Sequence, residues 1–518
     1  MKNVIYINCW VEPWIKVAQQ LQDEFGYKPV WWIGYSKEDN SHQIIPQQFP
    51  DIIYQDNADA WKGRFPKDIE EKAPYYYLDV DFLRRHSQHE LQAIKMMDRM
   101  DQDLRSFNFM ERQRHFRNMI KSWMAVIDLV KPDLVISTAI PHRLYDYVLY
   151  WLCEEKGIPF LTIQHTQFPG RFYFSKNEFY MLGDRFVSDW HQYENNSNID
   201  NHLSEDIKLR FEKVMLDYET GAPVFIKAMN NKEEEMEHPL FMIKRWFRKF
   251  TTKYRPYLWG KPADVTIIGH CAYDKRANKK YEDSEGNIYQ HERMILKANK
   301  YKKYIKQTYE SLTTIPDYKE QYVVHFLHYQ PEATTSPGGD IFVDQRLCVE
   351  LLLKYLPSNY KIYVKEHPHQ FSRMKIGHTG RMRDLYDDLI KNDRVRLIPI
   401  NINPFDLISN AKAVSTITGT AGWEAMVRQK PVIAFGLCWY ENYSKGVLRI
   451  TDEQSAKGMQ QFIENYSFDE HSLKAYLAAV GKNTYYADYF KANKKELIHL
   501  SKKENMDNVV NAIAACLE

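Results

Sequence analysis

The sequence predicts an α/β protein made of two doubly wound domains, each a mostly parallel sheet with helices on both faces. Three observations predict this class. The chain has 518 residues, which exceeds the length at which a single hydrophobic core stops growing. Strand and helix patterns alternate in both halves of the chain. A polar, irregular stretch over about residues 195–315 separates the two alternating regions.

The first half alternates short apolar runs with amphipathic helical patterns. Strands are expected at Val4–Ile7, Pro29–Gly34, Asp133–Thr138 and Ile158–Ile163. Helices are expected at Trp14–Phe25, Met119–Val130 and Tyr145–Lys156. Residues 84–118, rich in Met, Arg and Gln, are interpreted as a helical insertion. An N-terminal Rossmann-like domain is therefore predicted over residues 1–215.

The second half repeats the alternation after a linker or insertion over residues 216–315. Strands are expected at Tyr322–Leu327, Lys361–Val364, Val395–Ile398, Ala413–Ile417 and Val432–Phe435. Helices are expected at Tyr301–Leu312 and Ile341–Tyr355, and further helices follow to Leu517. A second Rossmann-like domain, with C-terminal helices, is therefore predicted over residues 316–518.

The composition excludes several classes of protein. A net charge of +2 argues against an electrostatic nucleic-acid binder. The six cysteines and 18 histidines form no CxxC or HExxH pattern, so no metal site is predicted. The chain starts without a signal-like region, and no apolar run approaches the roughly 18 residues that span a bilayer. We expect a cytoplasmic protein, or one peripheral on the inner face of the cytoplasmic membrane.

Residues 415–436 carry the most informative pattern. A strand ending at Ile417 runs through a turn of small residues, Thr418 to Gly422, into a short helix that Trp423 and Glu424 open. Such a turn presents free backbone N–H groups and the positive end of a helix dipole, which suits a phosphate. Glu424 could accept hydrogen bonds from a ribose. The alternative is an ordinary βαβ corner with an N-capping Thr.

A second polar cluster ends the strand Lys361–Val364. Lys365, Glu366, His367 and Pro368 follow it directly. Ligands of open parallel sheets bind outside the carboxyl ends of strands. Pro368 stops the strand and biases His367 toward an extended backbone. His367 can donate a hydrogen bond to a phosphate oxygen, and Lys365 can add positive charge.

The third segment, residues 328–340, is a polar, Pro- and Gly-rich loop after another strand, Tyr322–Leu327. Three motifs, Gln330-Pro-Glu-Ala-Thr-Thr-Ser-Pro, Val364-Lys-Glu-His-Pro and Thr416-Ile-Thr-Gly-Thr-Ala-Gly-Trp-Glu-Ala, occur in this order and spacing. The chain here resembles the bacterial capsule polysaccharide biosynthesis family, which is related to the Kdo transferases of capsule and lipopolysaccharide assembly. The resemblance covers about residues 320–440.

The resemblance implies a GT-B glycosyltransferase fold, with the donor nucleotide on the C-terminal domain and the acceptor on the N-terminal domain. Two Rossmann-like halves separated by a linker agree with it, although epimerases acting on nucleotide sugars share this architecture. It further implies that His367 and Pro368 contact the donor phosphate. Thr418, Gly419 and Thr420 would hold the same phosphate, and Glu424 would lie near the ribose.

Two further residues of the C-terminal half, Gln330 and Glu332, are expected to line the cleft side of the sheet. Gln330 is counted with the donor-binding residues, and Glu332 is a catalytic candidate that would orient donor hydroxyls. Preorganised hydrogen-bond donors around a leaving phosphate lower the barrier by several kcal/mol, so no metal cofactor is required in principle.

A catalytic base or nucleophile is expected from the N-terminal half. His142 and Asp146 follow the strand 133–138, and they would share one face if this stretch is helical. They are the first candidates for a base and its orienting partner, and Glu12 and His165 are rivals. The alternative is a capping Asp and a surface His.

Residues 241–259 mix basic and aromatic side chains. Such a segment could lie on an anionic membrane near a lipid-linked acceptor. A basic helix packed on its own domain by its aromatic side chains is the alternative. RNA binding is the third interpretation, and the near-zero net charge and absence of a nucleic-acid motif argue against it.

The predicted function is therefore transfer of a nucleotide-activated sugar to a glycan or glycolipid acceptor in capsule or lipopolysaccharide assembly. The resemblance favours a CMP-activated ulosonic or nonulosonic acid, such as Kdo or a sialic-acid-like sugar, as the donor. Two alternatives remain open. One is a transferase of the same fold using a UDP-sugar or CDP-polyol, and the other is a non-catalytic glycan- or lipid-binding partner of a capsule assembly complex.

Overall fold

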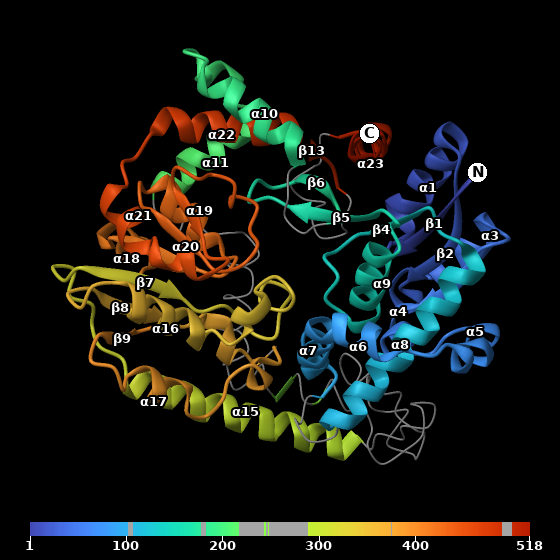
Figure 1. Cartoon of the computed structure of the whole chain (residues 1–518), viewed down its shortest axis with the longest axis horizontal. Helices are drawn as coiled ribbons and strands as arrows, with labels where there is room; N and C mark the ends of the chain where they lie inside the picture. Colours follow the sequence, from blue (N-terminus) through green and yellow to red (C-terminus); the bar gives the residue numbers. More distant parts are fainter. Residues whose placement is uncertain are drawn as a thin grey trace. The chain divides into compact units, whose positions relative to one another are not determined.

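The computed structural model describes residues 1–101, 107–177, 183–216, 243–244, 247, 288–373, 375–488 and 500–517. The chain divides into two compact units. Unit 1 comprises Met1–Met97, Asn108–Ile207 and Glu470–Glu518, and unit 2 comprises Asp98–Phe107 and Lys208–Asp469. Each unit is built on one sheet, so the predicted α/β class with two parallel-sheet domains is confirmed (Figure 1).

The sheet of unit 1 has seven strands in the order β13-β6-β5-β4-β1-β2-β3. The strands are β1 (Lys2–Ile7), β2 (Tyr27–Gly34), β3 (Ile53–Asp56), β4 (Leu134–Ser137), β5 (Phe160–His165), β6 (Arg171–Lys176) and β13 (Tyr485–Tyr486). Strands β3, β2, β1, β4 and β5 are parallel, whereas β6 and β13 add an antiparallel edge.

Helices cover both faces of this sheet. The helices of unit 1 are α1 (Val11–Phe25), α2 (Ser36–Asp39), α3 (Ser41–Gln48), α4 (Asn57–Trp61), α5 (Lys67–Lys72), α6 (Val80–Arg85), α7 (Ser87–Met96), α8 (Phe109–Val130), α9 (Leu144–Glu155), α10 (Gly183–Glu194), α22 (Glu470–Asn483) and α23 (Lys502–Leu517). The alternation of side chains along β2 sets the two faces. Trp32 packs in the core that α1 and α23 share, and Trp31 contacts Trp123 of α8 on the other side.

Unit 2 has six strands, all parallel, in the order β12-β11-β10-β7-β8-β9. They are β7 (Tyr322–Phe326), β8 (Lys361–Lys365), β9 (Val395–Ile398), β10 (Ala413–Thr416), β11 (Val432–Ala434) and β12 (Val447–Arg449). Counted from β7, this is the doubly wound order 3-2-1-4-5-6 of a Rossmann fold. The chain leaves β7 toward β8 on one side and resumes at β10 on the other, so the topological switch point lies between β7 and β10.

The helices of unit 2 also lie on two faces of its sheet. They are α15 (Ile288–Ser311), α16 (Arg346–Tyr355), α17 (Leu385–Leu389), α18 (Pro404–Asn410), α19 (Thr420–Val427), α20 (Glu453–Lys457) and α21 (Met459–Asn465). The short 3₁₀ turns η6 (Asp340–Val343), η7 (Pro368–Phe371) and η8 (Gly377–Thr379) connect them. On one face, Val323 and Ile362 pack with α15 and α16 side chains. On the other, Tyr322 stacks on Tyr363 at 4.1 Å and donates a hydrogen bond to the Leu407 carbonyl of α18.

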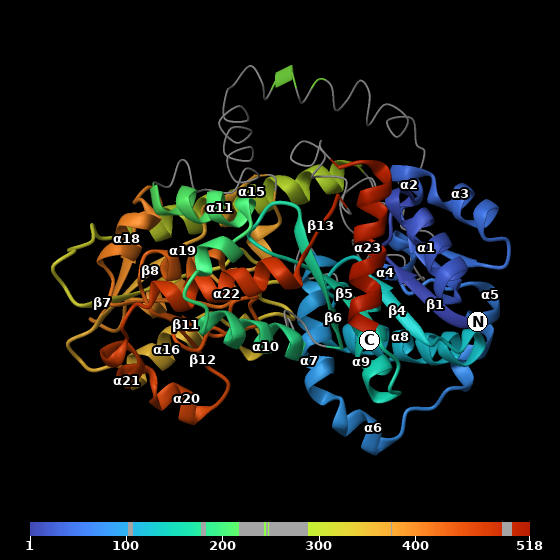
Figure 2. The ribbon, with the colours of Figure 1, turned by 90° about the horizontal axis from the view of Figure 1, so that it is seen from above.

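The C-terminal segment corrects the predicted domain boundary. Residues 470–518 were expected in the second domain, but they belong to unit 1. Strand β13 pairs with β6, and α23 packs beside β6 and α1 (Figure 2). Buried Val509 and Ile513 supply the apolar surface that α1 requires. Helix α11 (Glu205–Leu216) spans the boundary near residue 207.

Two helices are longer than predicted. Helix α8 begins at Phe109 rather than Met119, because Asn108 and Glu111 form a capping box there. Helix α15 begins at Ile288 rather than Tyr301. The predicted linker, 216–315, and the basic aromatic segment, 241–259, lie mostly outside the described residues. Of the helices that the structure describes, none is long and apolar enough to cross a membrane.

Candidate functional site

Three loops of unit 2 carry the residues that the sequence singled out. They follow β7, β8 and β10, and β10, β7 and β8 are neighbours in the sheet. All three strands are parallel, so the loops meet at the carboxyl edge of the sheet, where open α/β folds bind ligands. The carboxyl ends of β7 and β10 flank the switch point.

His328 joins the loop after β7 to the loop after β10. Its Nε2 lies 3.0 Å from the Thr416 hydroxyl and accepts hydrogen bonds from the N–H groups of Ile417 (3.2 Å) and Thr418 (3.3 Å). Burial, and to a smaller extent the charge of Arg381, lower the pKa of His328 to about 3. The imidazole is therefore neutral near pH 7, with Nε2 as acceptor and the proton on Nδ1.

Arg381 joins the loop after β7 to the loop after β8. Its Nε and Nη2 donate to the two carboxylate oxygens of Glu366, at 2.7 and 2.9 Å. Nη1 donates to the Gln330 side chain and to the Gly380 carbonyl, and Nη2 also donates to the His328 carbonyl. All five N–H groups of the guanidinium are thus used. A single buried arginine fixes these two loops relative to each other.

His367 follows the fixed Glu366 and remains partly exposed. Its backbone is extended, with φ −72° and ψ 125°, and Pro368 begins η7, as the sequence predicted. The Glu366 carboxylate accepts the His367 N–H at 2.6 Å, and His367 Nδ1 accepts the His369 N–H at 3.1 Å. Desolvation holds the pKa of His367 well below its usual value. The neutral ring therefore carries its proton on Nε2, which can donate to a ligand.

The start of α19 offers backbone N–H groups, but fewer than predicted. The Thr418 hydroxyl donates to the Thr334 carbonyl, and the Gly419 N–H donates to the Thr416 hydroxyl. Within the described chain, the N–H groups of Thr420 and Ala421 have no hydrogen-bond partner. A Cβ on Gly419 would lie 2.7 Å from the Thr416 hydroxyl oxygen, so only glycine fits at this N-cap. The alternative of an N-capping Thr is wrong, because Gly419 is the cap and makes no side-chain bond.

Glu424 lies inside unit 2 and is only 7% exposed. Its Oε1 accepts the Thr420 hydroxyl at 3.3 Å. The pKa of this carboxyl is raised to about 7, because burial outweighs the opposing effects of the hydrogen bond from Thr420 and the charges of Arg428 and Arg210. The carboxyl is thus placed to orient the Thr420 side chain, and its expected position at a ribose stays a prediction.

Of the other predicted residues of unit 2, two are buried and one is exposed. The Gln330 amide nitrogen donates to the Val343 carbonyl, and its oxygen accepts from Arg381, so the side chain already bonds to groups inside unit 2. Lys365 is 5% exposed, and its ammonium donates to the Ile400 carbonyl. Burial lowers the pKa of Lys365 to about 8. Glu332, in contrast, is exposed, and it accepts the Thr334 hydroxyl at 3.2 Å.

The catalytic candidates of unit 1 are arranged differently from the predicted pair. Asp146 is fully buried and accepts the Arg143 N–H at 2.7 Å, so it caps α9. Burial raises its pKa to about 7. His142 precedes the helix, and its Nδ1 lies 2.6 Å from the Ile140 carbonyl oxygen. The expected i, i+4 pairing in one helix is therefore wrong, and the alternative of a capping Asp describes Asp146.

Two rival candidates in unit 1 also follow strands. Glu12 follows β1 and has a non-helical backbone at the beginning of α1. His165 ends β5 and is exposed.

Sequence reasoning gave no role to His328, Glu366 or Arg381, which hold the site together. His328 and Glu366 stand inside the quoted motifs, and their place directly after buried strands was the available signal. Arg381 lies in a loop between η8 and α17, with no pattern that marks it. Its role appears only when the fold brings it to Glu366.

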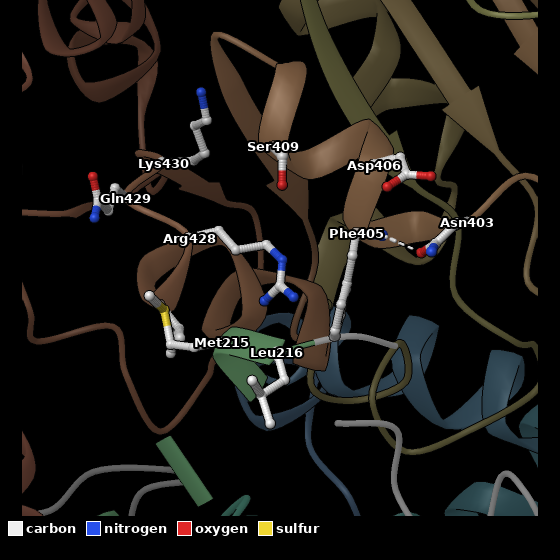
Figure 3. A pocket seen from close by; sticks show the side chains of 10 residues that line it. Met215, Leu216, Asn403, Phe405, Asp406, Ser409, Arg428, Gln429 and Lys430 are labelled. Carbon is white, nitrogen blue, oxygen red and sulfur yellow. Dashed lines mark hydrogen bonds between the residues drawn. The ribbon is translucent and has the colours of Figure 1, made fainter. Parts of the chain in front are cut away.

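A separate pocket of about 500 Å³ lies in unit 2, at the C-terminal end of α19. There the Arg428 guanidinium lies over the Phe405 ring, 3.5 Å from its centroid (Figure 3). The guanidinium also donates to the Val214 carbonyl. The lining residues are Met215, Leu216, Asn403, Phe405, Asp406, Ser409, Val427, Arg428, Gln429 and Lys430. None of them is a predicted site residue. Among the residues with described positions, no group of three or more His, Cys, Asp or Glu could hold a metal ion.

Comparisons with known structures find low similarity. The chain is similar to the β-Kdo 2,4 transferase KpsC of Thermosulfurimonas dismutans, at 13% identity and a TM-score of 0.30, over 73% of this chain and 86% of that one. It is also similar to the UDP-GlcNAc 2-epimerase of Methanocaldococcus jannaschii, at 12% identity and a TM-score of 0.23, over 99% and 100% of the two chains. These values are too low to transfer an activity.

Comparison of sequences is more specific. The chain is 34% identical over 82 residues to the capsule polysaccharide modification protein LipA of Neisseria meningitidis serogroup A, covering 16% of this chain and 11% of LipA. LipA of serogroup B matches over the same length and identity. The chain thus spans about a tenth of the length of these curated relatives.

One family model matches a longer part of the chain. Residues 289–487 match the family described as capsule polysaccharide biosynthesis protein. This range contains every strand of the unit 2 sheet and all three loops that meet at its carboxyl edge. The resemblance read from the three motifs is confirmed for residues 289–487, which match the model of the capsule polysaccharide biosynthesis protein family.

Proposed function

We propose that this protein is a glycosyltransferase of capsule polysaccharide assembly. It transfers a sugar from a nucleotide-activated donor, bound by unit 2, to a glycan acceptor. The observation that carries this proposal is the junction of three strand-end loops at the switch point of unit 2. The match of residues 289–487 to the capsule polysaccharide biosynthesis family supports the class of reaction.

The donor phosphate is assigned to the start of α19. The unpartnered N–H groups of Thr420 and Ala421 point out of the first helical turn, where the helix dipole favours an anion. The Nε2–H of His367 is a second donor, held in place through Glu366 and Arg381. Neutral donors of fixed position stabilise charge that develops on a leaving phosphate, without reorganisation during the reaction. We propose that these groups, rather than a metal ion, stabilise the leaving nucleotide.

The proposed donor is a CMP-activated acidic sugar, of the ulosonic or nonulosonic class. Glu424 acts in this proposal through Thr420, which it orients, and Glu332 is the exposed carboxylate that orients donor hydroxyls. The proposal does not use Gln330 or Lys365 as direct ligands, because internal carbonyl groups and Arg381 already bind their side chains.

Thermal unfolding with nucleotides tests the proposal. CMP at about one hundred times its dissociation constant should stabilise the folded protein by roughly 2.7 kcal/mol. For a domain of this size, that is a rise in melting temperature of about 5–10 °C. UMP, UDP and GDP should give no comparable rise.

Variants locate the nucleotide. His367→Ala should abolish transfer and most of the CMP shift while leaving the circular dichroism spectrum unchanged. His191→Ala, on α10 of unit 1, is the matched control and should keep both. A larger shift with UDP than with CMP would assign another donor. No shift with any nucleotide would favour a non-catalytic binding partner, and helix loss in His367→Ala would make this histidine structural.

A further inference from the structure

Unit 1 contains an arginine whose guanidinium is held at one nitrogen and open at the others. Arg143 is the N-cap residue of α9, in the segment that follows β4. It lies at the carboxyl edge of the unit 1 sheet, where β1 and β4 are neighbours. The chain turns from β1 toward β2 and resumes at β4, so this is the switch point of unit 1.

One nitrogen of Arg143 is fixed by neighbouring oxygens. Nη1 donates to the Asn8 Oδ1 at 2.6 Å and to the Tyr35 hydroxyl at 3.0 Å, with the Tyr145 hydroxyl at 3.4 Å. Asn8 follows β1 with φ 61°, a left-handed conformation that asparagine tolerates. Its Oδ1 also accepts from Asn57 at 2.7 Å and from Tyr145 at 2.5 Å. The acceptor that holds Arg143 is thus itself held from two sides.

The remaining donors of Arg143 have no partner in the part of the chain that the structure describes. Within the described residues, every side-chain hydrogen bond of Arg143 uses Nη1, and none uses Nε or Nη2. Its guanidinium also forms no ion pair with a described carboxylate. The nearest acid, Asp146, accepts the backbone N–H of Arg143 and the Asn8 amide instead. The Arg143 side chain is only partly exposed.

Two other arginines show what a structural guanidinium does in this protein. Arg381 uses all five N–H groups, and Arg171 of β6 likewise distributes its three nitrogens over Asp206, Ser204, Thr484 and the Gly481 carbonyl. Each of them also has a carboxylate partner. Arg143 is equally well anchored at Nη1, but it has no such carboxylate partner among the described residues. Nε and Nη2 present the parallel pair of donors that matches the two oxygens of a carboxylate or phosphate.

We propose that Arg143 binds an anionic group, a carboxylate or a phosphate, of the acceptor glycan. Asn8 and Tyr35 are positioning residues that fix the orientation of the guanidinium. This proposal rests on the proposed transferase function and deepens it, because it assigns the acceptor to the acidic or phosphorylated glycans. It concerns unit 1 alone and does not involve the donor residues of unit 2.

Binding of simple probes to the full-length chain tests the proposal. Ligand-observed NMR titration would compare glucuronate with glucose, for the carboxylate, and glucose 1-phosphate with glucose, for the phosphate. We expect the wild-type protein to bind at least one anionic probe about tenfold or more tightly than glucose, as a charge-assisted bidentate contact implies. Whichever anion binds more tightly identifies the source of the charge.

Three variants separate the effect of the paired Nε and Nη2 donors from the effect of the positive charge. Arg143→Gln should lose the preference for the anion, whereas Arg143→Lys should keep only part of it, because an ammonium lacks the planar fork. Tyr35→Phe removes one anchoring oxygen and should weaken anion binding a few-fold without removing a charge. Arg84→Gln, which changes an exposed arginine of α6, is the matched control and should bind like wild type.

Circular dichroism and the CMP-induced melting shift accompany each variant. An unchanged CMP shift in Arg143→Gln, together with loss of anion preference, would confirm the proposal independently of the donor site. Equal binding of anionic and neutral probes by the wild type would overturn it, and so would an undiminished preference in folded Arg143→Gln. If Arg143→Gln does not fold, Tyr35→Phe decides, and unaltered anion binding by that variant would overturn the proposal. A failed CMP shift with a preserved anion preference would contradict only the proposed donor.

Discussion

Arg381 and Glu366 form an ion pair whose side chains are 1% and 0% exposed. Glu366 also accepts hydrogen bonds from the Tyr386 hydroxyl and the His367 N–H. A charged carboxylate is costly to bury unless hydrogen bonds and an opposite charge compensate it, so Glu366 depends on these donors. At the scale of single residues, the position of His367 therefore depends on Arg381, whose five N–H groups all donate to groups inside unit 2.

Arg381→Met should destabilise the protein by about 3–5 kcal/mol, because it leaves the Glu366 charge buried without its partner. Chemical denaturation would measure the loss. The double variant Arg381→Met/Glu366→Leu should recover part of it, since neither charge then remains. Arg346→Met is the control: its ion pairs are partly exposed to solvent, so its loss of stability should stay within about 1 kcal/mol. A loss of that size for Arg381→Met would contradict the proposed dependence.

Sequence reasoning placed residues near the site better than it assigned their contacts. Lys365 and His367 were both predicted at a strand end, and both are there. In a regular strand, residues 365 and 367 would point to the same side. Strand β8 ends at Lys365 and η7 begins at Pro368, so the regular alternation stops between them. Lys365 donates to the Ile400 carbonyl, while His367 remains partly exposed. Which side faces a ligand depends on partners distant in sequence, such as Arg381, that no local pattern shows.

At the scale of elements, the turn between β10 and α19 depends on a residue from another strand end. His328 accepts the N–H groups of Ile417 and Thr418, so these groups need no ligand. The N–H groups of Thr420 and Ala421, which follow in the chain, have no hydrogen-bond partner among the described residues. We therefore propose the phosphate site at these two N–H groups, nearer the helix than the sequence predicted.

This role of His328 predicts a pH dependence of stability. Its pKa is about 3 in the folded chain and near 6.5 when unfolded, so between these values the unfolded state binds one more proton. The free energy of unfolding should therefore decrease as the pH falls below about 6.5, by up to roughly 1.4 kcal/mol per pH unit for this residue. Nothing is lost above pH 7, where both states are neutral.

His328→Gln removes the titration but keeps a side-chain acceptor. The free energy of unfolding should be measured between pH 4.5 and pH 7. Its slope against pH should be smaller for the variant than for the wild type, by the equivalent of about one bound proton. Equal slopes would mean that His328 titrates normally in the folded chain. At pH 7, the variant reports separately how well an amide oxygen replaces the imidazole nitrogen.

Strands were predicted more accurately than helix ends, and the reason is physical. Strand β9 was predicted with its observed bounds, Val395–Ile398, because a buried parallel strand is a continuous apolar run. Helix α19 begins at Thr420 instead of Trp423. Its first turn holds only small residues, which carry no helical periodicity, and the tertiary contact of Thr416 with the Gly419 N–H defines its start.

At the scale of the whole molecule, the chain order and the units do not coincide. Residues 470–518 follow all of unit 2 in sequence but complete unit 1. The prediction for this segment was wrong because an apolar helix pattern indicates that the helix packs on a core, but not on which one. The partners lie in unit 1. Arg171 of β6 donates to the Gly481 carbonyl and the Thr484 hydroxyl, and α1 packs on α23.

This arrangement predicts that a C-terminal substitution acts on the N-terminal unit. Ile513 of α23 is 0% exposed and lies in the core with Val4, Tyr6 and Trp14. Ile513→Ala should destabilise unit 1 by about 2–5 kcal/mol, the usual cost of this cavity. Ile315→Ala, at a position 77% exposed, is the matched control and should change stability by less than about 0.5 kcal/mol.

Scanning calorimetry with and without CMP would show which unit responds. Each unit has its own core, so we expect two unfolding transitions. Ile513→Ala should lower the transition of unit 1 and leave that of unit 2 in place. CMP, if unit 2 binds it, should raise the other transition. Two outcomes would contradict the assignment of this segment to unit 1 alone. In one, Ile513→Ala lowers the transition that CMP raises. In the other, the chain unfolds in a single step that both the substitution and CMP shift, so that α23 stabilises both units together.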